Sequence, residues 1–186
     1  VLKLLKFFQK ISGLKTNIDK TIAFSLGTCC GKEIHGKTFG LKWEKENISI
    51  LGLVIDGNEE TNYKVNFEKR IQSIQTLTQI WTQRNLTLKG KITIINALLL
   101  PKLMYPVTNL CVPERVYNEV EQILYSFLWN GKPAKIRKNV IIRQISKGGL
   151  KMPDFKTKVQ SWKTHWVKRA GADTHSLWLT LVNVFL

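Results

Sequence analysis

Residues 81–107, WTQRNLTLKGKITIINALLLPKLMYPV, restrict the possible folds of this chain more than any other segment. An almost unbroken apolar run extends from Ile92 to Leu100, after a basic turn and just before a Pro-Lys pair. A helix that is apolar on every side has to be surrounded by other elements. The segment therefore predicts a helix from about Thr87 at the centre of a bundle, and Pro101 and Pro106 are expected to limit or kink it.

Other segments carry apolar stripes at helical spacing. We expect four such helices, and the stripes contain Leu2, Leu5, Phe8 and Ile11; Tyr63, Phe67, Ile71, Ile74, Thr78 and Trp81; Val116, Val120, Ile123 and Phe127; and Phe155, Val159, Trp162 and Trp166. Gly13, Arg84-Asn85 and Asn130-Gly131 are expected to mark helix ends.

Short β-branched runs broken by glycine lie between the first two of these helices. Residues 20–27, 32–40 and 48–56 are expected to form a few antiparallel strands, followed by a turn over residues 56–62. Residues 140–145, VIIRQI, are a possible short strand, and Asp154 is an expected N-cap of the last helices. The sequence therefore predicts an α+β fold that is predominantly helical.

The charge balance indicates a polyanionic partner. The chain has 29 Lys and Arg against 13 Asp and Glu, a net charge of +16, which is more than solubility requires. The stretch from Lys132 to Arg169 contains Asp154 as its only acidic residue. Such asymmetry is typical of a binding face, although a solvated surface remains an alternative.

Three groups of basic residues are candidates for phosphate contacts. The first surrounds the start of the central helix, whose backbone N–H groups favour anions, and consists of Arg84, Lys89 and Lys91. The second flanks a Gly/Pro turn and consists of Lys132, Lys135, Arg137 and Lys138. The third is a loop expected to expose its backbone, with Lys147, Gly148, Gly149 and Lys151. Phosphate contacts of this kind supply affinity without reading sequence. The spacing of Trp129, Trp162 and Trp166 favours core packing over base stacking.

Catalytic and metal-binding patterns are weak. Magnesium chemistry needs clustered carboxylates, and the candidates Asp19, Asp56, Glu59 and Glu60 include no Asp-Asp or Asp-x-Asp pair on a strand. Cys29, Cys30 and His35 lack the second half of a zinc motif, and the cysteines indicate no disulfide framework. We expect no membrane span, because the apolar runs reach roughly ten residues where a bilayer needs about twenty. The chain does not look like a complete enzyme.

Five segments in order resemble the reverse transcriptase of non-long-terminal-repeat, LINE-type retrotransposons. They are FFQKISGLKTNIDKT, ISILGLVID, residues 81–107, FLWNGKPAKIR and GGLKMPDF, and the likeness covers about residues 2–169. It begins just after that family's Phe/Tyr-x-Asp-Asp motif and continues through the thumb. The chain starts at Val1, and we expect it to be a fragment whose catalytic aspartates lie upstream.

The resemblance implies a remnant of the antiparallel palm sheet over residues 1–60, a helical thumb over 61–131 and a basic post-thumb region over 132–186. It implies an RNA-directed DNA polymerase fragment that grips an RNA–DNA hybrid or duplex, with Lys102 and the residues at the start of the central helix facing phosphates. We expect no catalytic residue, metal site, small-molecule substrate or membrane partner in this fragment, and Mg²⁺ only in the complete polymerase. The fragment alone is expected to be inactive, within an intracellular ribonucleoprotein of nucleus and cytoplasm.

Two other hypotheses stay open. A domesticated or decayed remnant would act as a non-catalytic helical module that binds proteins or nucleic acid, with the edge of its incomplete sheet as a docking site. The basic amphipathic ends, VLKLLKFF and LWLTLVNVFL, are also compatible with a membrane-surface protein.

Overall fold

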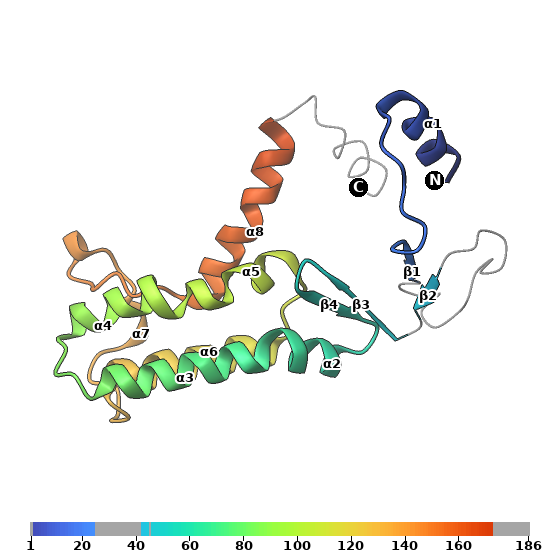
Figure 1. Cartoon of the computed structure of the whole chain (residues 1–186). Helices are drawn as coiled ribbons and strands as arrows, with labels where there is room; N and C mark the ends of the chain where they lie inside the picture. Colours follow the sequence, from blue (N-terminus) through green and yellow to red (C-terminus); the bar gives the residue numbers. More distant parts are fainter. Residues whose placement is uncertain (1, 25–41, 45, 173–186) are drawn as a thin grey trace. The chain divides into compact units, whose positions relative to one another are not determined.

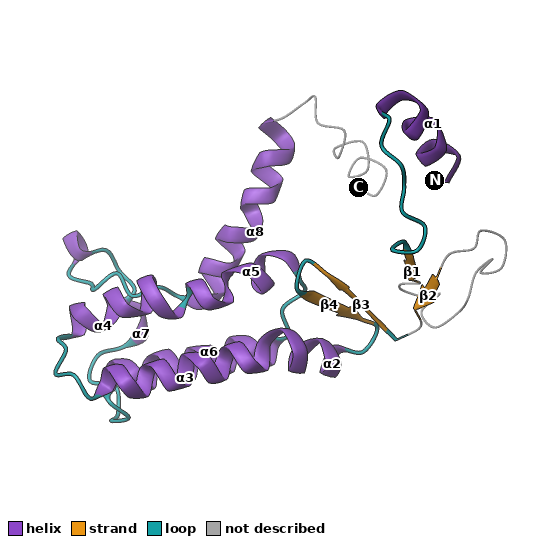
Figure 2. Ribbon diagram, in the orientation of Figure 1, coloured by secondary structure: helices purple, strands orange, loops and turns teal. Residues whose placement is uncertain are grey.

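A computed structural model describes residues 2–24, 42–44 and 46–172 (Figure 1). The chain divides into two compact units, residues 1–62 and residues 63–186, and each is described by itself. Most described residues are helical, and the strands form two small two-stranded sheets (Figure 2). The predicted α+β, predominantly helical class is therefore confirmed.

The first unit begins with helix α1 (Leu2–Ser12). It ends at the predicted glycine: Gly13 has a φ of +71° and donates its backbone N–H to the Gln9 carbonyl at 3.1 Å. A glycine adopts this left-handed conformation without the steric cost of a Cβ atom. The predicted helix and its stop are both confirmed.

The strands pair in two different ways. Strand β1 (Ile22–Phe24) runs parallel to β2 (Lys42–Glu44), whereas β3 (Asn47–Ile50) and β4 (Leu53–Asp56) form an antiparallel hairpin. The prediction of antiparallel strands is thus correct for the hairpin and wrong for β1 and β2. Parallel pairing needs a connection of roughly a dozen residues or more, and residues 25–41 are long enough. The strand expected over residues 32–40 lies outside the described residues.

The hairpin turn has two left-handed residues. Leu51 has a φ of 50° and Gly52 a φ of 79°, which match the two-residue type I′ turn that follows the twist of paired strands. After β4 the chain turns over residues 57–58 and helix α2 (Glu59–Tyr63) begins, so the turn predicted over residues 56–62 is correct only in its first part. The Asn62 amide ties the start of this helix back to the end of β4. Its Oδ1 accepts the Asp56 backbone N–H at 2.9 Å, and its Nδ2 donates to the Asp56 carbonyl at 2.7 Å.

The second unit contains the predicted stripe of the long helix. Helix α2 (Glu59–Tyr63) leads through a π-helical turn, η2 (Lys64–Glu68), into α3 (Lys69–Thr82). The predicted residues are all buried or packed on the core: Tyr63, Phe67, Ile71, Ile74, Thr78 and Trp81. Asn66 and Leu77, which were not predicted, are also buried or packed there. The helix also ends close to the expected position at Arg84.

The central helix is divided into three parts. Thr87 caps α4 (Leu88–Ile94), because its hydroxyl accepts the Gly90 N–H at 3.2 Å. A π-helical turn, η3 (Ile95–Leu99), follows and ends where the Leu100 N–H reaches the Ile95 carbonyl at 3.0 Å. Helix α5 (Pro101–Asn109) then starts at Pro101, which has no N–H to donate. The predicted limit at Pro101 is confirmed, whereas Pro106 stays inside α5.

The central helix is not surrounded on every side, so this prediction is wrong. Ile92, Ile95 and Leu99 are buried, but Leu98 is 39% exposed, and the neighbouring Thr93, Asn96 and Ala97 also face outward. The polar side chains on this face bond to the helix itself. Thr93 donates to the Lys89 carbonyl at 3.1 Å, and Asn96 to the Ile92 carbonyl at 3.0 Å. The two polar residues interrupt the apolar run on one face, which therefore needs no cover.

Helix α6 (Glu114–Trp129) completes the bundle as predicted. It buries Val116, Val120, Leu124, Phe127 and Leu128. It ends at Asn130, with a φ of 53°, and at Gly131, whose N–H donates to the Ser126 carbonyl at 2.8 Å.

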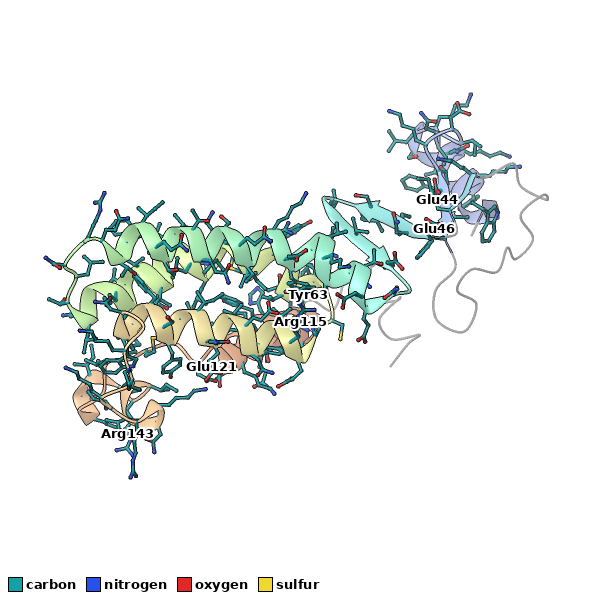
Figure 3. All side chains as sticks on the ribbon, turned by 90° about the horizontal axis from the view of Figure 1, so that it is seen from below. Glu44, Glu46, Tyr63, Arg115, Glu121 and Arg143 are labelled. Atoms are coloured by element: carbon teal, nitrogen blue, oxygen red, sulfur yellow. The ribbon has the colours of Figure 1, made fainter. Side chains whose placement is uncertain are left out.

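Helices α3 and α6 run in the same direction. Near their starts, the Tyr63 hydroxyl donates to Glu119 Oε2 at 2.6 Å, Arg115 Nε donates to Glu119 Oε1 at 2.7 Å, and the Arg115 guanidinium lies 4.1 Å from the centre of the Tyr63 ring (Figure 3). Near their ends, Thr82 and Gly131 line the same groove. The central helix runs in the opposite direction, from the ends of α3 and α6 toward their starts.

The segment after α6 contains no strand among residues 132–154, so the prediction for residues 140–145 is wrong. Residues 138–141 form α7 (Lys138–Ile141), and a 3₁₀ turn, η4 (Ile145–Lys147), follows. This part has no neighbouring strand to pair with, and its β-branched residue Ile141 is buried in the helical core instead.

Helix α8 (Phe155–Ala172) starts at the predicted cap. The Asp154 carboxylate accepts the Thr157 backbone N–H at 3.1 Å and its hydroxyl at 2.6 Å. Phe155, Val159 and the half-buried Trp162 pack on the core, as predicted. Trp166 is 45% exposed, so its predicted core position is wrong. Residues 175–186 of the expected last helices lie outside the described residues. Within the described part, every helix is too short or too polar to cross a bilayer.

Candidate functional site

Basic side chains gather at the end of the second unit where α3 and α6 finish and α4 starts. We call this surface, residues 83–90 and 131–151, the basic end. Every charged residue in these two ranges is Lys or Arg: Arg84, Lys89, Lys132, Lys135, Arg137, Lys138, Arg143, Lys147 and Lys151. Lys91 bonds to the end of α6 just before the second range, and Lys89 and Lys151 line one cavity.

The first predicted group is at the start of α4. Arg84 is exposed, and its guanidinium lies 4.8 Å from the centre of the Trp81 ring, which orients it on the surface. Lys89 is exposed as well, in the first turn of α4.

Lys91, from the same group, is buried with 4% of its surface exposed. Its ammonium donates at 3.1 Å to the carbonyl oxygens of both Phe127 and Leu128, and also to Asn130 Oδ1. The last carbonyls of a helix have no partner within the helix, and Lys91 supplies one to α6. Burial lowers the pKa of this ammonium, while its three acceptors match the three donors of the charged form. Lys91 therefore caps the end of helix α6, and its buried ammonium is not exposed to bind phosphate.

The second predicted group lies on the loop after α6. Lys132, Lys135 and Arg137 are exposed. Lys138 is tied to the bundle instead, because its ammonium pairs with Glu121 of α6 and, at 3.2 Å, with Asp154 Oδ1. Burial alone would lower the pKa of Lys138, but these two carboxylates raise it above its usual value. The loop beside them lines an open pocket of about 430 Å³.

The third predicted group lies on a loop whose backbone N–H groups donate to carbonyls of the same region. The Gly149 N–H donates to the Gln144 carbonyl at 3.0 Å, the Lys151 N–H to the Arg143 carbonyl at 2.9 Å, and the amides of residues 147, 148 and 150 also bond within this region. The prediction of an accessible backbone is therefore wrong. Only the side chains of Lys147 and Lys151 remain available, and both are exposed.

Gly149 is required by this loop. A Cβ atom there would lie 2.1 Å from the Arg143 carbonyl oxygen and 2.5 Å from its carbon, which is closer than atoms can approach. Lys151 itself has a φ of 55°. The strain in this loop fixes the direction from which its lysines leave the backbone.

The structure brings the first and third groups to one cavity. Lys89 of α4 and Lys151 of the loop line a space of about 370 Å³, together with Ile92, Ile145 and Leu150 among others. Two cations from distant parts of the sequence thus stand beside an apolar cavity.

Arg143 was missed by sequence reasoning. Residues 140–145 suggested a strand, which would have used this side chain in a sheet, but Arg143 is exposed on the basic end and points outward (Figure 3). The signal that could have found it is the absence of acidic residues over Lys132 to Lys151.

A groove adjoins the basic end. This groove of about 710 Å³ lies between α3 and α6, and Asn130 and Gly131 stand at its end. Its other lining residues are mostly amides and hydroxyls, and Glu119 is the acidic one: Gln75, Thr78, Gln79, Thr82, Glu119, Gln122, Ile123, Ser126 and Phe127. It offers neutral hydrogen-bonding groups rather than cations.

Lys102 is not part of the basic end. It lies on α5 and lines a different cavity with Lys69 and Arg70, two cations that sequence reasoning did not single out. Their signal in the sequence was an adjacent cation pair directly before the buried Ile71.

The described residues bring no metal-ligating side chains together, and of Trp129, Trp162 and Trp166 the last is exposed. Among the described residues, no three His, Cys, Asp or Glu side chains are grouped to hold a metal, and Asp56 Oδ1 accepts the Asn58 N–H within its own turn. Cys29, Cys30 and His35 lie outside the described residues. The half-buried Trp129 packs against the core as predicted. No protein-family model matches the chain.

Proposed function

We propose that this chain grips the sugar-phosphate backbone of an RNA–DNA hybrid or duplex through its basic end. The observation that carries this proposal is the meeting of two acid-free segments, residues 83–90 and 131–151, at one end of a helical bundle. Lysine and arginine side chains on such a surface neutralise phosphates and release counterions. The contacts supply affinity without base recognition.

The resemblance to LINE-type reverse transcriptases gives this grip a biological setting. In that reading, residues 1–60 are the last part of the palm, residues 61–131 the thumb and residues 132–186 a basic continuation. The chain would hold the template–primer hybrid of an RNA-directed DNA polymerase in an intracellular ribonucleoprotein. The catalytic aspartates and Mg²⁺ would belong to residues outside this chain, which would be inactive alone.

The test is the salt dependence of binding. Fluorescence anisotropy with a labelled RNA–DNA hybrid is measured between about 50 and 200 mM salt, and each phosphate neutralised should add about 0.9 to the slope of log K against log salt on a duplex. A triple variant, Lys132→Gln, Lys135→Gln and Arg137→Gln, should weaken binding and lower this slope by about two to three.

A matched control removes charge elsewhere. Lys6 and Lys10 are exposed on α1, and replacing both by Gln should lower the slope by less than the loss of two residues of the basic end. Affinity that barely responds to salt, or an equal effect of the α1 variant, would contradict a phosphate grip at the basic end.

A second candidate function is a helical protein-interaction module, the role expected of a domesticated or decayed remnant. It is favoured by the exposed apolar side chains Leu98, Met104 and Tyr105, which are 39%, 46% and 44% exposed. A pull-down that survives nuclease treatment and is lost on Met104→Glu, but kept in the basic-end triple variant, would support this function instead.

A further inference from the structure

A second cationic cavity lies away from the basic end. It has a volume of about 420 Å³ and is lined by Val65, Lys69, Arg70, Ser73 and Lys102. Val65 belongs to η2, Lys102 belongs to α5, and the other three belong to α3. Two elements far apart in the sequence therefore direct three cations toward one space.

The cavity has an uncompensated positive charge. Its ionisable lining residues are all basic. Within the part of the chain that the structure describes, ion pairs are formed by Lys42, Arg115, Lys138 and Lys156 and by none of these three cations. Like charges that converge without a carboxylate repel each other, and a bound anion relieves this repulsion.

Arg70 is held in place before any ligand arrives. Its Nη1 donates to the Asn66 carbonyl at 2.5 Å, and Asn66 is only 1% exposed. Arg70 itself is half-buried, while Lys69 and Lys102 are exposed. A guanidinium that is anchored at one nitrogen loses little freedom when its other N–H groups bind an anion. The Ser73 hydroxyl adds a neutral donor at the same cavity.

We infer that this cavity binds a phosphate group. The planar fork of an arginine matches two phosphate oxygens, and the two lysines act as point charges on the others. The phosphate is either part of a nucleic-acid backbone or a free phosphate. The inference goes beyond the proposed function, because it concerns a separate cavity and does not depend on binding at the basic end.

The experiment uses the full chain and two probes. Inorganic phosphate is titrated while the backbone N–H signals of residues 69–73 are followed by NMR, and the same proteins are tested for RNA–DNA hybrid binding by anisotropy. The variants are Arg70→Gln and Lys102→Gln, and the second keeps the test valid if the loss of Arg70 disturbs the helix. Lys64→Gln is the matched control, because Lys64 is exposed on η2 and does not line the cavity.

Each outcome either supports or contradicts the phosphate site. Saturable phosphate shifts that weaken about tenfold in both variants and stay unchanged in Lys64→Gln support a free-phosphate site. Absence of those shifts, with hybrid affinity reduced in the two variants alone, supports a backbone phosphate. No effect on either probe, or an equal effect of Lys64→Gln, overturns the inference.

The experiments can contradict the proposed function and the cavity inference independently of each other. If only the basic-end triple variant loses hybrid affinity and no phosphate shifts are seen, the cavity has no role and the proposed function stands. If only the cavity variants respond, the cavity binds phosphate and the grip by the basic end is wrong.

Discussion

Lys91 Nζ lies 3.1 Å from the carbonyl oxygen of Phe127, inside the core of the second unit. The ammonium also reaches Leu128 and Asn130, so one side chain joins the start of α4 to the end of α6. This contact positions the two segments of the basic end against each other. It also separates Lys91 from its neighbour Lys89, which faces solvent two residues earlier.

Replacement of Lys91 by Met should destabilise the second unit. The apolar stem is kept, but two carbonyls of α6 and the Asn130 amide oxygen lose their donor, at a cost of about 1–3 kcal/mol for buried groups left unpaired. Urea unfolding followed by circular dichroism measures this loss. Lys89→Met is the control, and its exposed side chain should change the free energy of unfolding by less than about 0.5 kcal/mol. Equal effects of the two variants would contradict the cap.

Replacement of Gly149 by Ala should disrupt the loop that carries Lys147 and Lys151. The added Cβ atom would meet the Arg143 backbone at 2.1 Å, and backbone cannot rotate away as a side chain can. We expect a loss of at least about 2 kcal/mol in unfolding free energy, together with weaker hybrid binding. Gly171→Ala is the opposite control, because nothing lies within 4 Å of the new atom and alanine is favoured in a helix by about 1 kcal/mol.

The carboxylate of Asp154 should stabilise the protein in a pH-dependent way. Burial would raise its pKa, but hydrogen bonds from Thr157 and Lys138 outweigh burial and hold the pKa of Asp154 below its usual value of 3.8. Because the pKa is lowered in the folded state, the contribution is complete above about pH 4 and is lost as the pH falls through the folded value.

Asp154→Asn tests this dependence, since asparagine still caps the helix but carries no charge. The variant should be less stable than the native chain at pH 7, and the difference should shrink steadily below about pH 4. Asp154→Ala also removes the cap and should lose about 0.5–2 kcal/mol at every pH. A difference between the native chain and Asp154→Asn that does not vary with pH would contradict the role of the charge.

Replacement of Tyr63 by Phe should weaken the junction between α2 and α6. The hydroxyl bond to the Glu119 carboxylate would be lost, at about 1.5–3 kcal/mol for a bond to a charged group. Burial and Glu119 raise the pKa of Tyr63 to about 12, so the folded state holds this proton more tightly. The stabilisation is present below about pH 10 and decreases above it.

Unfolding measurements on a double-mutant cycle with Glu119→Gln check the Tyr63 bond. The two changes together should cost less than the sum of the single changes, because both remove the same contact. Strict additivity would show that the hydroxyl and the carboxylate do not interact.

Much of the helical bundle follows from the sequence, because its signals are local. The stripe from Tyr63 to Trp81, the Thr87 cap, the stop at Asn130-Gly131 and the Asp154 cap each depend on residues within a few positions of one another. These features are set by side-chain period and capping chemistry, which a single sequence displays.

The misjudged features depend on residues that are distant in sequence. The parallel pairing of β1 with β2 depends on a long connection, and the burial of Lys91 depends on carbonyls more than thirty positions later. The amides of the glycine loop are a local exception, because they bond to carbonyls of residues 141–145 just before them. A basic residue near a helix start has the same sequence signal whether it faces phosphate or caps another helix, so the distinction between Lys89 and Lys91 needed the structure.

The common direction of α3 and α6 has an electrostatic consequence for the free protein. The peptide dipoles of both helices place their negative ends where the lysines and arginines of the basic end are most crowded. That partial negative charge lowers the cost of holding so many cations together, beside the two carboxylates that pair with Lys138. The bundle can therefore fold before its partner arrives, with its cations already arranged in one place.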